Sequence, residues 1–132
     1  MRYLPLTARI LLGLLFTVTG LNGFLNFLPQ PAAPMPAGAV AFAGAMVKTG
    51  YLMPLLMATQ LISGLLLLAG RFVPLALALL APVVINIVAF HLFLAPAGLP
   101  LAGVVLVLEV YLAWAYRGAF LPMLSRRAMP SR

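Results

Sequence analysis

The sequence contains no cysteine and is poor in ionisable side chains. Its 132 residues include a single acidic residue, Glu109, and a single histidine, His91. The absence of cysteine excludes disulfide chemistry, thiolate nucleophiles and iron–sulfur clusters held by cysteine. One glutamate and one histidine are too few for a metal site with three or four nitrogen or oxygen ligands in one chain. The residues therefore predict no metal centre.

Charge of either sign is scarce, whereas apolar side chains are abundant. Charged residues make up 7% of the chain and hydrophobic residues 65%, against about 25% and about 45–50% in soluble domains. A chain this short cannot bury so much apolar surface as a soluble globule. The composition predicts an integral membrane protein whose main partner is the lipid bilayer.

The net charge of +7 does not indicate nucleic-acid binding. The arginines are not gathered on one amphipathic face with aromatic residues between them. They stand at the ends of apolar runs, where the positive-inside rule places them. We therefore expect no nucleic-acid partner.

Four apolar stretches are long enough to cross a membrane as helices, which takes about 20 residues. Proline-rich or glycine-containing breaks separate them, and short loops make successive helices antiparallel neighbours. The sequence predicts an all-α fold: one transmembrane domain over residues 1–132, folded as a four-helix bundle. The expected spans are residues 6–28, 51–69, 72–94 and 101–120.

The segment from Gly38 to Thr49 is apolar but too short to span the bilayer. We expect a short helix between the first two spans, either flat at the interface or tucked against the bundle. Lys48 near its end suits a helix C-terminus.

The distribution of cations predicts the topology. With four spans, both termini lie on one side, together with all the arginines, and only Lys48 lies opposite. This bias places the N- and C-termini in the cytoplasm. The first apolar run is longer than a signal-peptide core and lacks a convincing cleavage site, so we expect a retained anchor. The predicted location is a bacterial inner membrane.

Polar side chains at membrane depth are costly, so each one raises the question of its partner. Counted along the spans, Gln60 and Glu109 lie near the midplane, and the others lie in the outer half: Asn22, Asn26, Asn86 and His91. This distribution predicts an outward-facing polar pocket floored by Gln60 and Glu109, with the asparagines as candidate ligand-binding residues. The alternative is that the amides only join helices, at about 0.6 kcal/mol each.

Glu109 and His91 are the candidate catalytic residues. An ionised carboxylate at the midplane costs several kcal/mol without a partner, and no Lys or Arg lies at its depth. Glu109 is therefore expected to be neutral, or bonded to Gln60, His91 or a polar ligand. His91 stands about 140° around the helix from Asn86, so the two share a face only if Pro82 bends the helix.

Met57 is a further candidate ligand-binding residue. It belongs to a stripe at helical spacing that includes Met53, Gln60 and Gly64. Methionine packs adaptably against irregular apolar ligands. As a helix-packing face, a stripe of this kind is ordinary.

Several segments together resemble the DoxX family of small bacterial membrane proteins. They are Arg9–Phe16, Gly20–Phe24, Thr49–Leu52, Gly64–Phe72 and Ala81–His91. The resemblance spans roughly residues 9 to 121. It implies a four-helix inner-membrane bundle, and relatives associated with membrane oxidoreductase complexes, including a thiosulfate:quinone oxidoreductase. The family often has glutamate where this chain has Gln60, so any proton role at that position would fall to Glu109.

These observations lead to three functional hypotheses. The first is a small subunit of a quinone-linked oxidoreductase, with hydrogen bonds from Asn86, His91 or Gln60 to a quinone and proton transfer by Glu109 or His91. The chain has no evident electron carrier, so electrons would come from a partner protein or a bound cofactor, and its status as an enzyme stays open. The second is a membrane scaffold, chaperone or assembly factor. The third is a small-solute transporter that works as a homo-oligomer.

Overall fold

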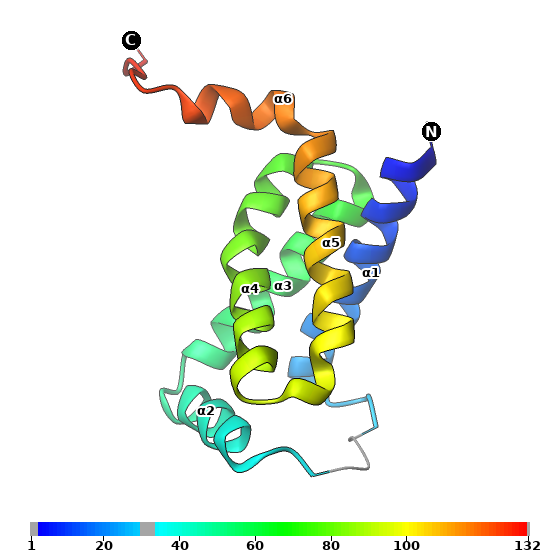
Figure 1. The fold of residues 1–132 in the computed structure, drawn as a ribbon, viewed down its shortest axis with the longest axis vertical. Coiled ribbons are helices and arrows are strands. Elements are labelled where there is room, and N and C mark those ends of the chain that lie inside the picture. The colour runs from blue at the N-terminus through cyan, green and yellow to red at the C-terminus, as the bar shows by residue number, and fades with distance from the viewer. Residues whose placement is uncertain (1–2, 30–33, 132) are drawn as a thin grey trace.

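The computed structural model describes residues 3–29 and 34–131, and the regular secondary structure of this part of the chain is all helical. Arg2 and Arg132, which contribute to the predicted charge bias, lie outside these ranges. Four long helices stand side by side (Figure 1). They are α1 (Tyr3–Leu25), α3 (Leu52–Ala69), α4 (Val73–Phe93) and α5 (Leu99–Ala115). The shorter elements are α2 (Ala37–Lys48), η1 (Pro96–Gly98), α6 (Arg117–Phe120) and η2 (Leu121–Leu124).

The long helices have the length and composition of membrane spans. Four helical segments of the described chain have at least 18 residues and are apolar enough to cross a bilayer. The predicted all-α fold, with a short helix between the first two spans, is therefore confirmed. The protein is a multi-pass membrane protein.

Helices α1 and α3 pack closely because glycines meet at their interface. A Cβ atom on Gly64 would lie 2.6 Å from the backbone nitrogen of Thr17 and 2.9 Å from the carbonyl oxygen of Gly13. Gly20 approaches the backbone of Leu61 in the same way. Small residues let helices approach closely in a membrane, where dispersion and hydrogen bonding drive association.

The bundle interior is apolar over most of its length. Its largest fully buried side chains include Phe16, Leu12, Leu77, Leu80 and Leu112. Large apolar side chains on the outer faces of the helices are exposed, which suits contact with lipid. They include Leu75, Ile85, Leu101 and Val107.

Helix α1 ends three residues before its apolar run does. Asn26 takes a left-handed conformation with φ 51°, a conformation that asparagine tolerates better than most residues. The Asn22 side chain reaches past this turn, and its Oδ1 accepts a hydrogen bond from the backbone N–H of Leu28 at 2.8 Å. The two asparagines therefore terminate the helix.

Helix α5 begins and ends earlier than the expected fourth span, and it stops at Ala115. Arg117 follows the break, its guanidinium lies 4.5 Å from the centre of the Trp114 ring, and its Nη1 donates to the Trp114 carbonyl oxygen at 2.9 Å. Helix α6 then leaves the bundle sideways (Figure 1). Glu109 consequently lies six residues, or about 9 Å, from the end of the helix rather than at the middle of a longer span.

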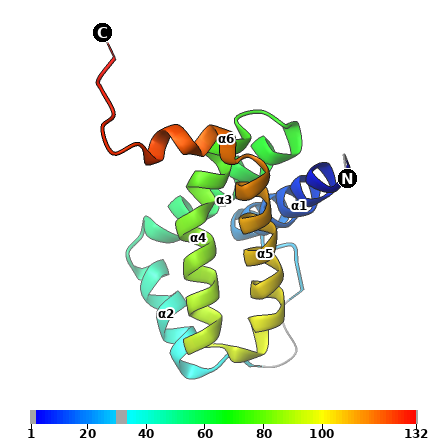
Figure 2. The same ribbon diagram turned by 45° about the horizontal axis from the view of Figure 1, so that its top comes forward.

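The two ends of the bundle differ. Both chain termini lie at one end, and α2 lies across the other (Figures 1 and 2). Arg9 packs against Gly70 at the turn between α3 and α4, so it belongs to the end that carries the termini. Lys48 closes α2 at the opposite end. The side of the membrane that each end faces stays a prediction.

Candidate functional site

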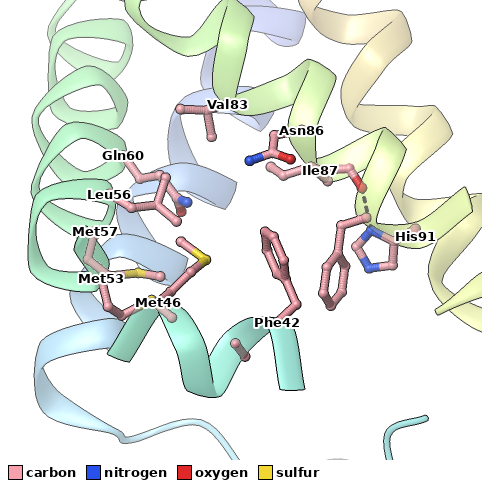
Figure 3. A pocket seen from close by; sticks show the side chains of 12 residues that line it. Phe42, Met46, Met53, Leu56, Met57, Gln60, Val83, Asn86, Ile87 and His91 are labelled. Carbon is pink, nitrogen blue, oxygen red and sulfur yellow. Dashed lines mark hydrogen bonds between the residues drawn. The ribbon is translucent and has the colours of Figure 1, made fainter. Parts of the chain in front are cut away.

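A pocket of about 240 Å³ lies between α2, α3 and α4. Its walls are largely apolar, and three side chains that can form hydrogen bonds interrupt them (Figure 3). The lining residues are Phe42, Ala43, Met46, Met53, Leu56, Met57, Gln60, Val83, Asn86, Ile87, Phe90 and His91. Of the residues singled out in the sequence, Met57, Gln60, Asn86 and His91 line this pocket, whereas Glu109, Asn22 and Asn26 do not.

Gln60 is held in place from the neighbouring helix. Its side chain is 7% exposed, and its Oε1 accepts a hydrogen bond from the Thr19 hydroxyl of α1 at 3.1 Å. With Oε1 engaged in this way, the Nε2 amide group remains available as a donor. A buried amide of this kind contributes both to helix association and to the polarity of the pocket.

Asn86 approaches the same pocket from α4. Figure 3 shows its carboxamide on the wall opposite Gln60, with Val83 between and above them. Within the described residues, the carboxamide of Asn86 has no hydrogen-bond partner. It can therefore offer both a donor and an acceptor to a molecule in the pocket.

His91 stands at the edge of the pocket with a fixed ring orientation. Its Nδ1 lies 2.8 Å from the carbonyl oxygen of Ile87, and because a carbonyl only accepts, Nδ1 carries the proton. Nε2 is then the acceptor in the neutral ring. The ring packs against Gly98 of η1, where any Cβ would collide with it. His91 and Asn86 thus line one pocket despite their angular separation along α4.

Aromatic rings and thioethers form the remaining walls. The rings of Phe42 and Phe90 lie 5.6 Å apart, and Phe90 meets the His91 ring edge-on at 5.2 Å. Met53 and Met57 of α3 lie across the pocket from Phe42 (Figure 3). Met57 also packs against Gly23 of α1, so it serves the helix interface as well as the pocket.

Glu109 does not share this pocket with Gln60. It lines a second cavity of about 280 Å³ that involves α4, α5 and α6, and the two cavities have no lining residue in common. From their similar depth along the spans, Gln60 and Glu109 were expected to form the floor of one pocket. The packing instead turns Glu109 of α5 towards Leu77 and Phe120.

Asn22 and Asn26 are also absent from the pocket. Their hydrogen bond and backbone conformation place them at the end of α1, as described above. Conversely, Phe42 and Phe90 were not among the predicted site residues. Nothing in the sequence shows which face of α2 docks against α4, so only the tertiary packing identifies this aromatic wall.

The fold and the pocket together define a small multi-pass helical membrane protein with a largely apolar site at one end of its bundle. The chain matches the DoxX family over residues 4–93, and it belongs to this family. Neither the curated proteins nor the solved structures give a significant match. The matched region contains every residue of the pocket between α2, α3 and α4, whereas Glu109 and α5 lie beyond it.

Proposed function

We propose that the pocket between α2, α3 and α4 binds the ring of a lipid-soluble quinone or a similar ring compound. The chain would act as a small subunit of a quinone-linked membrane oxidoreductase. The observation that supports this most directly is the pair of carboxamides, Gln60 and Asn86, on opposite walls of an otherwise apolar pocket. Ligand sites typically combine apolar walls with a few polar groups that fix the orientation of the ligand.

The lining residues fit a quinone ring. A quinone carries two carbonyl oxygens on opposite sides of a flat ring, and the amide groups of Gln60 and Asn86 can each donate a hydrogen bond to one of them. Phe42 and Phe90 can pack against the ring edge or face. Thioethers such as those of Met46 and Met53 interact favourably with aromatic rings.

The size of the pocket limits what it can enclose. Its volume of about 240 Å³ lies below the roughly 300–1,000 Å³ of sites that enclose drug-sized ligands. The pocket therefore suits a single ring, with any isoprenoid tail outside among the lipids. His91 at its edge can pass a proton through Nε2 to an oxygen of the ring as the ring is reduced.

The redox part of the proposal rests on the complexes with which the DoxX family is associated. Within the described residues, no three His, Asp, Glu or Cys side chains are grouped so as to hold a metal ion. Electrons would come from a partner protein, and the role of this chain is to hold and orient the ring and to pass it the protons that its reduction consumes. A bound quinone supplies the two-electron acceptor itself.

The first experiment is to purify the protein in a mild detergent and analyse an organic extract by mass spectrometry. We expect a quinone or related ring compound at near-stoichiometric amounts. A short-chain analogue, decylubiquinone, should also bind the extracted protein. Asn86→Leu should weaken that binding by about two- to tenfold, because one hydrogen bond is worth about 0.5–1.5 kcal/mol.

The matched control is Ile85→Leu, at an exposed position next to Asn86 on α4. This variant should bind decylubiquinone as the unsubstituted protein does. An extract without any ring compound, together with unchanged analogue binding in Asn86→Leu, would contradict the proposal.

That negative result would favour the second function, a membrane scaffold or assembly factor. The observation that supports it is the hydrogen bond between Thr19 and Gln60, which joins α1 to α3 as interhelical polar contacts do. In this case co-purification should recover a partner protein, and single substitutions at Asn86 and His91 should leave that association intact.

A further inference from the structure

The second cavity contains the sole acidic side chain of the protein. It lies between α4 and α5 beside Phe120 at the end of α6, with a volume of about 280 Å³. Three of its lining residues are alanines, and larger side chains at these positions would fill the cavity. The lining residues are Leu77, Ala78, Ala81, Glu109, Ala113 and Phe120.

Glu109 is buried at this cavity, and one of its two carboxyl oxygens is unsatisfied within the described chain. Its side chain is 6% exposed, and within the described residues its Oε2 atom is buried and makes no hydrogen bond. No cationic side chain lines the cavity, and the guanidinium of Arg117, at the start of α6, contacts the ring and carbonyl of Trp114. An orphan carboxyl oxygen in an apolar cavity requires an explanation.

The chemistry of a carboxyl group in this setting restricts what it can bind. An ionised carboxylate removed from water without a cation costs several kcal/mol, so the neutral carboxyl is the favoured form. A neutral carboxyl has one O–H donor. A buried donor or acceptor left without a partner destabilises the protein, and a ligand with a matching oxygen would supply that partner.

We propose that this cavity is a second binding site, for a neutral lipid-soluble molecule whose carbonyl oxygen accepts a hydrogen bond from the Glu109 carboxyl. Ala78 is exposed on the outer face of α4, whereas Leu77 and Glu109 are buried. The molecule therefore enters sideways from the lipid. The site shares no lining residue with the pocket of Gln60 and Asn86, so it does not depend on the proposed quinone function.

A lipid-soluble carbodiimide tests the accessibility of this carboxyl. With dicyclohexylcarbodiimide, the carboxyl proton moves to one nitrogen of the reagent and the carboxyl oxygen bonds to its central carbon, giving an O-acylisourea that rearranges to an N-acylurea. Since Glu109 is the sole acidic side chain, peptide mapping separates it from the C-terminal carboxyl. We expect one added reagent molecule at Glu109, and its absence would overturn the proposal.

Protection from the reagent tests the hydrogen bond itself. We expect 2-undecanone to slow the modification about tenfold more than undecane does at equal membrane concentration, since one hydrogen bond to a carboxyl is worth about 1.4 kcal/mol. The two molecules are similarly apolar, but only the ketone carries an acceptor. Equal protection by both, or protection by neither, would overturn the proposal. This comparison uses the unsubstituted protein and needs no variant.

Two substitutions then locate the site. Ala81→Leu should fill the cavity and reduce the modification rate at least tenfold, whereas Asn86→Leu in the other pocket should leave it unchanged. Circular dichroism confirms that each variant is folded, and Ala113→Val provides a second cavity-filling variant if Ala81→Leu is not. Modification of the filled variants at the original rate, or an equal loss in Asn86→Leu, would overturn the assignment.

Discussion

Gly64 illustrates how strongly one residue constrains this bundle. A methyl group at this position would meet backbone atoms of α1 at 2.6 and 2.9 Å, and backbone cannot move aside as a flexible side chain can. Gly64→Ala should therefore separate α1 from α3 and destabilise the protein by about 1–3 kcal/mol. The expected result is a lower midpoint of thermal unfolding in detergent.

Gly103 of α5 provides the control, because nothing lies within 4 Å of a Cβ built on it. Gly103→Ala should keep or raise the unfolding midpoint, since alanine favours the helix by about 1 kcal/mol. Equal destabilisation by both substitutions would show that close approach of α1 and α3 is not the cause.

Substitution of Asn22 can distinguish whether this residue stabilises the fold or binds a ligand. Its Oδ1 accepts a hydrogen bond from Leu28 N–H at 2.8 Å, and it lies outside the pocket. Asn22→Ala should lower the free energy of unfolding by about 0.5–1 kcal/mol while decylubiquinone binding stays unchanged. Loss of binding without loss of stability would restore the ligand-binding role expected from depth alone.

At the scale of elements, α2 acts as a wall of the pocket rather than as part of the bundle. Phe42 packs against Phe90 with ring centres 5.6 Å apart, and Val40 on the same helix is 54% exposed. Because an aromatic pair is worth about 0.5–1.5 kcal/mol, Phe42→Ala should weaken decylubiquinone binding by about two- to tenfold.

The comparison with Val40→Ala makes this test specific to the docked face of α2. That substitution should leave binding unchanged, and neither variant should alter the helical content measured by circular dichroism. Identical affinities for the two variants would mean that α2 contributes no wall to the site.

At the scale of the whole molecule, the charge bias predicts an orientation that can be measured directly. The chain has no cysteine, so single cysteines can be introduced without other changes. Ala37→Cys at the start of α2 should react with a membrane-impermeant maleimide added to intact bacterial spheroplasts. Ser125→Cys, near the end that carries both termini, should react only after the membrane is opened. The reverse pattern would contradict the cytoplasmic placement of the termini.

Much of the fold follows from the sequence because the bilayer imposes it. Each apolar run must satisfy its backbone hydrogen bonds internally, and a helix does so, so α3 and α4 fall within one residue of their expected bounds. The ends of α1 and α5 differ because local contacts decide them. Asn26 adopts a left-handed turn inside an apolar run, and Arg117 binds back to Trp114.

The sequence by itself determined the membrane location, the four helices and the choice of polar residues worth examining. Only the tertiary structure decided how those residues are grouped. Depth along a span follows from counting residues, but the direction a side chain faces depends on how the helices rotate against one another. That rotation is set here by glycine contacts between α1 and α3 and by the docking of α2 on α4. It joins Gln60, Asn86 and His91 in one pocket and turns Glu109 into another.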